Sequence, residues 1–276
     1  MISQDVIIPV DGSNMQVYMA RPQEGSGPHP AVIVLHELFG FTPETKRVTE
    51  LMASIGYVGL AMDYYHRTDP QTSEAYTEEG MKRALEIARP VTASNLGADI
   101  RGAVEWLNAQ PFVKTGKIAT LGFGFGATAA FVTADQRDLC GAIMFYPTYL
   151  STSMPGGGEP PLEHAGKADV PLLLIFGEQD YYVSRYDMDR IRQTLKAAGK
   201  DVRMQIYPNV GHSFFRHGRP QAVEELKSYS DEAVAQAVAD SWDLVKSFLM
   251  DVFNRPQQHA SETGDIRTER TQSIRV

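Results

Sequence analysis

The sequence predicts an α/β protein in which a mostly parallel central sheet carries helices on both faces and is preceded by an antiparallel hairpin. Two observations lead to this fold class. Short, continuously apolar runs alternate with longer amphipathic segments, which is typical of parallel strands that are covered on both faces and connected by helices. The chain has 276 residues, of which 43% are hydrophobic, so one large domain with a sizeable core can form.

The N-terminal part of the chain supplies the hairpin and the first helical connection. Residues 2–9 and 14–20 are predicted strands on either side of the turn VDGSN. Residues 31–35 are all apolar and predict a buried strand. Thr42 as N-cap and Pro43 at the first helical position then predict the start of a helix, which Gly56 can end.

The remaining elements follow the same alternation. Buried strands are predicted at residues 57–63, 117–123, 140–147, 170–180 and 202–208. Helices are predicted from apolar residues that share one face at residues 72–88, 92–109, 126–136, 184–198 and 231–252.

We expect a single domain over residues 1–254. Residues 148–169 interrupt the alternation directly after a strand and are rich in Pro, Gly and Ser, so we predict a flap-like insertion over a site. Residues 255–276 are polar and mixed in charge, and we predict a disordered tail. The alternative for this tail is a peptide that docks on a protein partner.

Composition narrows the range of partners. The net charge of −8 argues against nucleic acid as a partner. Cys140 is the only cysteine, so neither an intrachain disulfide nor a thiolate metal cluster can form. His36 and His66 lack partners at metal-ligand spacing, and we predict neither a metal nor a cofactor. Without an evident signal peptide or apolar span, the chain is expected to be cytoplasmic, away from membranes, and to bind a small-molecule substrate.

A glycine-rich corner, LGFGFGA, follows the strand predicted at 117–123 and has two interpretations. Gly124-x-Gly126-x-x-Ala129 formally matches a dinucleotide-binding loop, but the acidic residue expected about 20 positions later is missing. The alternative is a nucleophile elbow, Gly-x-Nuc-x-Gly, with Gly122 and Gly126 as the outer glycines. The elbow requires an acid and then a histidine at later strand ends, and both occur, as described next.

Asp180 ends the apolar run LLLIFGEQD, and His212 follows the strand predicted at 202–208. Both residues come after strands of a parallel sheet, so they are expected at the same edge as the elbow. Their order along the chain, after the elbow, is that of the acid and base of an α/β-hydrolase triad. The surroundings of the corner therefore favour the elbow.

Four segments, VIVLHELFG, LGFGFGA, GEQDYYVS and GHSFFR, resemble the corresponding segments of the dienelactone hydrolase family. The resemblance covers about residues 10–252 and implies the α/β-hydrolase fold and a carboxymethylenebutenolidase-like activity. It also implies that Asp180 orients His212, which acts as the base. By the same resemblance, Glu37 is the buried partner of the nucleophile in the resting enzyme.

Further roles follow from the same resemblance. The backbone N–H groups of Leu38 and Phe125 would form the oxyanion hole, and Arg216 would meet a carboxylate of the substrate. The sequence departs from the family at position 124, where the family has cysteine and relatives have serine. Gly124 has no side chain that can be acylated. Cys140 begins another strand and is interpreted as a small core residue.

Loss of the nucleophile side chain leaves room for about one water, on the order of 30 Å³. His212 could then act as general base on that water. Aromatic side chains at the strand ends are expected to shape a pocket for an apolar, planar or cyclic substrate, and about half of the following set is assigned to it. The set is Phe39, Phe41, Tyr64, Tyr65, Phe123, Phe125, Tyr146, Tyr149, Tyr181, Tyr182, Phe214 and Phe215. Of these, Phe39, Tyr64, Phe123 and Tyr146 are predicted to bind substrate.

Three functions remain open from the sequence. The first is hydrolysis of a small carboxylic ester or lactone, either weakly through water or not at all in an inactivated variant. The second is a non-catalytic relative that binds a small acid or a protein partner. The third is acid–base chemistry without a covalent step, as in an isomerase or lyase. The presence of Glu37, Asp180, His212 and Arg216 favours the first and third, because a pure scaffold has no chemical need for these side chains.

Overall fold

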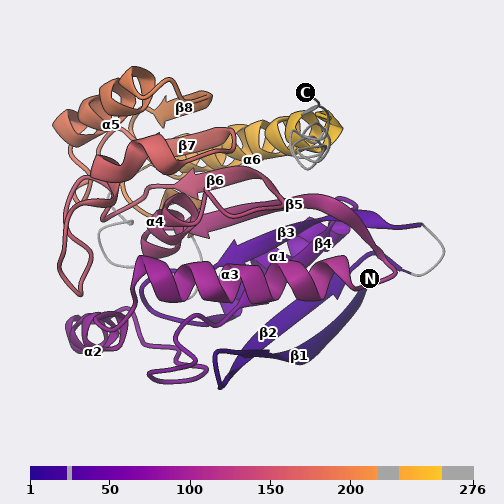
Figure 1. The fold of residues 1–276 in the computed structure, drawn as a ribbon. Coiled ribbons are helices and arrows are strands. Elements are labelled where there is room, and N and C mark those ends of the chain that lie inside the picture. The colour runs from indigo at the N-terminus through magenta and orange to yellow at the C-terminus, as the bar shows by residue number, and fades with distance from the viewer. Residues whose placement is uncertain (24–26, 217–229, 257–276) are drawn as a thin grey trace, which may run out of the picture.

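An eight-stranded sheet forms the centre of the protein in the computed structural model, which describes residues 1–23, 27–216 and 230–256 (Figure 1). The strand order is β1-β2-β4-β3-β5-β6-β7-β8. The strands are β1 (Ile2–Val10), β2 (Ser13–Arg21), β3 (His29–Leu35), β4 (Val58–Met62), β5 (Val113–Phe123), β6 (Leu139–Phe145), β7 (Leu172–Gly177) and β8 (Val202–Tyr207). The helices are α1 (Pro43–Ser54), α2 (Glu78–Ala88), α3 (Ala93–Asn108), α4 (Phe125–Val132), α5 (Arg185–Ala197) and α6 (Asp231–Asn254).

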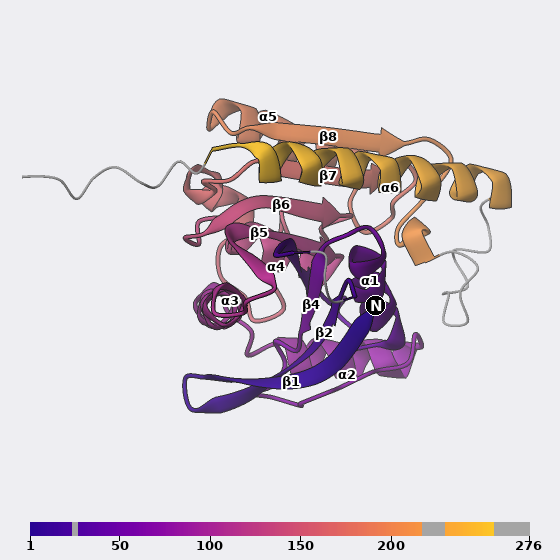
Figure 2. The same ribbon diagram turned by 90° about the vertical axis from the view of Figure 1, so that its right-hand side faces the viewer.

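The pairing of the strands confirms the predicted fold class. β1 and β2 form an antiparallel hairpin, and β2 also runs antiparallel to β4. All pairs from β4 through β3 to β8 are parallel. Asp11 and Gly12 turn the hairpin with φ angles of 48° and 77°, the left-handed pair that matches the twist of the two strands. Figure 2 shows the hairpin at one end of the sheet and β8 at the other.

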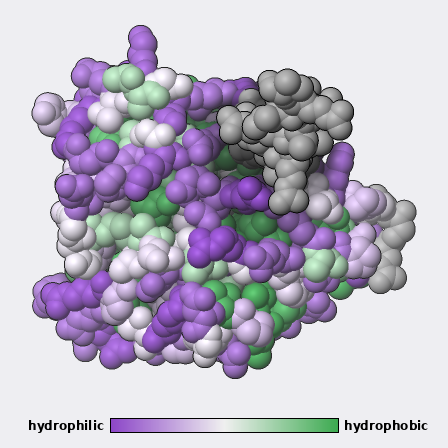
Figure 3. All heavy atoms as spheres, viewed as in Figure 1, coloured by the Kyte–Doolittle hydropathy of each residue, from purple (hydrophilic) through white to green (hydrophobic). Residues whose placement is uncertain are grey.

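Two apolar layers sandwich the sheet, as the alternation of side chains in a strand requires. In β3, Ala31, Ile33 and Leu35 belong to the core under α2, α3, α4 and α5. Val32 and Val34 belong to the opposite core under α1 and α6. Both faces of the sheet are therefore buried, and the view in Figure 3 shows mostly hydrophilic residues with smaller apolar areas between them.

The second predicted helix begins later than the sequence indicated. The prediction was residues 72–88, whereas α2 starts at Glu78, where the side chain of Thr77 accepts a hydrogen bond from the N–H of Gly80. The preceding residues pair with the loop after β3 instead, because the N–H of Phe41 donates to the carbonyl of Thr72 at 2.6 Å. This contact holds the segment that carries Tyr76 beside the ends of the strands.

The segment at residues 148–169 is anchored at several points. The short helix η1 (Pro161–Lys167) packs against α5, and Leu150, Leu162 and Ala165 are buried in the core. Of the tail predicted to be disordered, residues 257–276 lie outside the described residues. No helix in the described ranges is long and apolar enough to cross a membrane.

Candidate active site

The glycine corner forms a sharp turn between β5 and α4. Gly124 has φ 53° and ψ −113°, a conformation that side-chain-bearing residues rarely adopt. Its N–H donates to the carbonyl of Phe145 at 3.0 Å, which ties the turn to the neighbouring strand. The chain thus passes from strand to helix within a single residue, in a conformation that glycine can adopt, as at the nucleophile elbow of α/β-hydrolases.

The three glycines of the corner differ in the space around them. A Cβ at Gly122 would overlap the carbonyl group of Gly126, and a Cβ at Gly126 would overlap the carbonyl of His36. A Cβ at Gly124 would have a single neighbour within 4 Å, namely Nε2 of His212 at 4.0 Å. The outer glycines are therefore required by close backbone packing, whereas the central position is open toward the histidine.

His212 is held by Asp180 in an orientation that suits a general base. Nδ1 of His212 lies 2.8 Å from Oδ2 of Asp180, whose side chain is fully buried. The other oxygen, Oδ1, accepts from the N–H groups of Tyr182 at 2.8 Å and Val183 at 2.9 Å. Because the carboxylate is an acceptor only, Nδ1 of the imidazole carries the proton of this pair. Nε2, which faces the Gly124 position, is then free to accept a proton.

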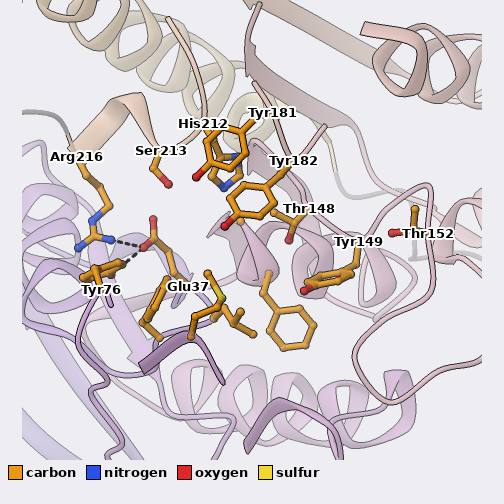
Figure 4. A pocket seen from close by; sticks show the side chains of 15 residues that line it. Glu37, Tyr76, Thr148, Tyr149, Thr152, Tyr181, Tyr182, His212, Ser213 and Arg216 are labelled. Carbon is orange, nitrogen blue, oxygen red and sulfur yellow. Dashed lines mark hydrogen bonds and ion pairs between the residues drawn. The ribbon is translucent and has the colours of Figure 1, made fainter. Parts of the chain in front are cut away.

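Glu37, Arg216 and Tyr76 form a second cluster at the cavity (Figure 4). Oε2 of Glu37 accepts from Nη1 of Arg216 at 2.6 Å and from the Tyr76 hydroxyl at 2.9 Å. The Arg216 guanidinium also lies over the Tyr76 ring, 3.8 Å from its centroid. The resemblance implied that Glu37 is the partner of the nucleophile, whereas its partners in the structure are Arg216 and Tyr76. Arg216, which was expected to meet a substrate carboxylate, forms an ion pair with Glu37.

Burial and charge both act on the pKa values of this cluster. Burial raises the pKa of the Tyr76 phenol, and the adjacent Glu37 raises it further, so the hydroxyl remains a donor. Burial is the largest single influence on Arg216 and lowers its pKa, but Glu37, together with Tyr76, Tyr146 and Glu44, outweighs burial, so the pKa is raised. Glu37 and Arg216 therefore form an ion pair, even though the Arg216 side chain is only 4% exposed.

The two residues proposed for the oxyanion hole both line the cavity. Phe125 is the first residue of α4, so its N–H has no carbonyl partner within the helix. Leu38 lies in the loop after β3 and faces the same space. The N-terminus of α4 adds partial positive charge at this point, which favours a developing oxyanion.

The cavity has a volume of about 170 Å³ and a largely apolar, aromatic wall. It is lined by Glu37, Leu38, Phe39, Tyr76, Met81, Gly124, Phe125, Thr148, Tyr149, Thr152, Tyr181, Tyr182, His212, Ser213 and Arg216. The structure thus brings together Gly124, Asp180, His212, Glu37 and Arg216 from distant segments, with Asp180 directly behind His212.

Three aromatic residues that the sequence assigned to substrate binding lie elsewhere. Tyr64 is buried, stacks on His36 and donates its hydroxyl to the carbonyl of that residue at 2.6 Å. Phe123 belongs to the core under α1 and α6 and stacks on Phe145. Tyr146 is fully buried, its ring lies against His212, and it is not among the residues that line the cavity. A position at a strand end does not decide on which side of the sheet a side chain lies, which corrects these three assignments.

Other lining residues were not singled out from the sequence. Tyr76, Met81, Thr148 and Thr152 come from loops and from α2, and no motif marks them. Tyr76 reaches the cavity through the pairing of its loop with the residues after β3, a contact that local periodicity does not reveal. Among the described residues, no group of three His, Cys, Asp or Glu side chains is arranged to hold a metal ion.

Comparisons with known proteins identify the family of the chain. The family model described as the dienelactone hydrolase family matches residues 15–253. A "Putative carboxymethylenebutenolidase" of Synechocystis sp. is 28% identical over 245 residues, which cover 88% of this chain and 95% of that protein. One of the same name from Saccharolobus solfataricus is 29% identical over 279 residues, covering 90% of this chain and 98% of the relative.

A solved structure shows the same fold. The crystal structure of a "Putative Dienelactone Hydrolase" from Klebsiella pneumoniae superposes with a TM-score of 0.77 at 23% identity. The match covers 90% of this chain and 98% of the Klebsiella chain. Together with the family model over most of the sequence, the elbow, the Asp180–His212 pair and this fold show that the chain is an α/β-hydrolase and belongs to the dienelactone hydrolase family.

Proposed function

We propose that the protein hydrolyses a small carboxylic ester or lactone and that a water molecule, in place of a side chain at position 124, attacks the carbonyl carbon. The observation that carries this proposal is the open position at Gly124 in front of His212. A Cβ there would lie 4.0 Å from Nε2. The γ atom of a side chain at this position would be bonded to that Cβ and would lie about 2.8 Å from Nε2, which is a hydrogen-bond distance. A water oxygen at the place of the missing γ atom would therefore be within reach of Nε2.

The proposed reaction uses groups that already surround this position. Nε2 of His212 takes a proton from the water as its oxygen attacks the carbonyl, and the negative charge moves to the carbonyl oxygen. The N–H groups of Leu38 and Phe125 stabilise that oxyanion. Collapse of the tetrahedral intermediate breaks the C–O bond of the ester, and His212 returns the proton to the leaving alkoxide. The products are a carboxylic acid and an alcohol, joined in one molecule if the substrate is a lactone.

Asp180 supports this cycle as a positioning residue. Its carboxylate fixes the Nδ1–H tautomer and stabilises the imidazolium that forms after proton transfer, as the acid of a triad does. Without a covalent nucleophile, the oxyanion hole and substrate binding are expected to leave about 10³–10⁴-fold acceleration over water. The names of the relatives support a lactone as substrate, since a carboxymethylenebutenolide is a lactone.

Rates with 4-nitrophenyl acetate and dihydrocoumarin test this function in the wild type, His212→Ala and Asp180→Asn. We expect slow hydrolysis by the wild type and a loss of about 10²–10⁴-fold for His212→Ala, which lacks the general base but keeps the oxyanion hole and substrate binding. The loss for Asp180→Asn should be no larger than that for His212→Ala. Equal rates for the wild type and His212→Ala would refute the water mechanism. An inactive wild type that still binds these compounds would favour a non-catalytic binding protein.

A second function has one specific observation in its favour. Oε1 of Glu37 is buried without a hydrogen-bond partner in the described part of the chain, and Glu37, like His212, is a residue of the cavity wall. Two basic groups at one cavity suit proton transfer between carbon or oxygen atoms of a bound molecule, as in an isomerase or lyase. In deuterated water, exchange of substrate hydrogen for deuterium without hydrolysis would favour this function if Glu37→Gln abolishes the exchange.

A further inference from the structure

Two neighbouring tyrosines of the cavity wall keep large aromatic surfaces in contact with solvent. Tyr181 is 53% exposed and Tyr182 is 48% exposed, and both line the cavity. Their ring centroids lie 4.3 Å apart and the two ring planes are tilted by 36°, so the rings pack on each other. We call this pair the tyrosine wall. Among the large hydrophobic side chains that are exposed in the described residues, these two belong to the cavity.

The tyrosine wall is held in place by the backbone of its loop. Oδ1 of Asp180 accepts hydrogen bonds from the N–H groups of Tyr182 at 2.8 Å and Val183 at 2.9 Å. Directly after these residues, Ser184 begins helix α5 with a capping box that it shares with Asp187. Because the loop is fixed on both sides, little ordering of the chain is needed when a ligand packs on the two rings, and the entropic cost of binding is low.

The tyrosine wall lies beside the proposed general base. The ring centroid of Tyr182 is 4.8 Å from that of His212, and the ring centroid of Tyr181 is 6.2 Å from it. Figure 4 shows both rings next to His212, with Glu37 on the other side of the open space. In the proposed reaction His212 returns a proton to the leaving alkoxide, so the alcohol part of the substrate must come within reach of this imidazole. The alcohol part therefore meets Tyr181 and Tyr182.

An aromatic ring is the group that such a surface binds best. Aromatic rings pack on one another in offset or edge-to-face arrangements with centroids about 4.5–7 Å apart, and they gain affinity beyond what the burial of apolar area alone provides. Tyr149 and Phe125 add two further rings to the cavity wall, with centroids 5.8 Å apart. A saturated ring of the same size would bury a similar area without the interaction between the rings.

We propose that the tyrosine wall determines substrate specificity, so that the site prefers an ester or lactone whose alcohol part carries an aromatic ring over one with a saturated ring. The assignment of this ring to the alcohol part rests on the proposed function. The preference for an aromatic ring concerns binding and is measured without turnover.

Binding of N-benzylacetamide and N-(cyclohexylmethyl)acetamide, measured by isothermal titration calorimetry, tests this preference. The two amides are the counterparts of benzyl acetate and cyclohexylmethyl acetate, they resist hydrolysis, and they differ in the aromatic character of one ring. For the wild type we expect the benzyl compound to bind about threefold or more tightly than the cyclohexyl compound. The double variant Tyr181→Leu/Tyr182→Leu keeps apolar side chains without aromatic rings, and we expect it to bind the two amides about equally.

Tyr186→Leu is the matched control. Tyr186 is 77% exposed and lies in the first turn of α5, four positions after Tyr182, but it does not line the cavity. We expect this variant to keep the ratio of the wild type. Circular dichroism checks that each variant is folded. If the double variant is not folded, the single variants Tyr181→Leu and Tyr182→Leu take its place, and each should reduce the ratio.

Equal or tighter binding of the cyclohexyl compound by the wild type would overturn the proposal, as would an unchanged ratio in the folded tyrosine variants. Loss of the ratio in Tyr186→Leu would overturn it too, because the preference would then not come from the cavity wall. Binding of neither amide would have the same consequence. A failure of the proposed function is distinct from these outcomes, since it shows as equal hydrolysis rates for the wild type and His212→Ala.

Discussion

Restoring a nucleophile at position 124 probes the elbow most directly. In Gly124→Cys, the new side chain would enter open space, since Nε2 of His212 at 4.0 Å is the single heavy atom within 4 Å of the added Cβ. The cost is backbone strain, because φ 53° and ψ −113° are unfavourable for a residue with a side chain. Such strain costs about 1–3 kcal/mol, and reduced freedom of the unfolded chain offsets about 0.4–1 kcal/mol of it.

We therefore expect Gly124→Cys to be destabilised by about 1–2 kcal/mol, measured by urea unfolding. Gly124→Ala, which has the same strain and no nucleophile, is expected to lose a similar amount. If either variant loses far more, or fails to fold, the open space at this position is not real and the elbow geometry is refuted.

The same variant should gain covalent catalysis. Removing a triad nucleophile costs up to about 10⁶ in kcat, so we expect Gly124→Cys to raise kcat/KM for 4-nitrophenyl acetate by at least about 100-fold. An initial burst of one 4-nitrophenolate per chain and an acyl adduct on residue 124 in mass spectrometry would identify the new step. Gly124→Ala should show neither, and combining Gly124→Cys with His212→Ala should remove the gain. A folded Gly124→Cys without burst or adduct would refute the assignment of position 124.

Three further predictions concern stability and the native thiol. Gly126→Ala places a methyl group against the carbonyl of His36 and should destabilise by about 1–3 kcal/mol or more in urea unfolding, whereas Gly166→Ala, with open space, should not. Burial lowers the pKa of His36 from 6.5 to about 3, so the unfolded chain binds the extra proton between these values. The free energy of unfolding should therefore fall as pH drops below 6.5, by up to about 1.4 kcal/mol per unit, and His36→Asn should reduce this slope. Burial raises the pKa of Cys140 to about 11, so its reaction with thiol reagents at pH 8 should be slow. Because Cys140 is not a residue of the cavity wall, Cys140→Ala should keep the hydrolysis rate of the wild type, and a large loss of activity would contradict a purely structural role.

Much of the fold could be predicted because each element leaves a local pattern. Parallel strands buried on both faces appear as short apolar runs, and the helices between them repeat their apolar residues every three to four positions. The positions of Gly124, Asp180 and His212 after separate strands could also be interpreted together, since parallel strands end at one edge of the sheet. Helix α2 was predicted too long because pairing with a distant loop holds residues before it in another conformation.

The sequence by itself determined the strand–helix alternation, the elbow and the absence of a side chain at Gly124. Only the tertiary structure decided that Arg216 pairs with Glu37, which is 179 positions away along the chain, and that Tyr76 completes this cluster. It also decided that Tyr64 lies in the core and not in the cavity wall. The reason is that the periodicity of apolar residues reports which residues are buried. It does not report which residue pairs with a buried charge or which side chain at a strand end faces a cavity, because both depend on how distant segments pack.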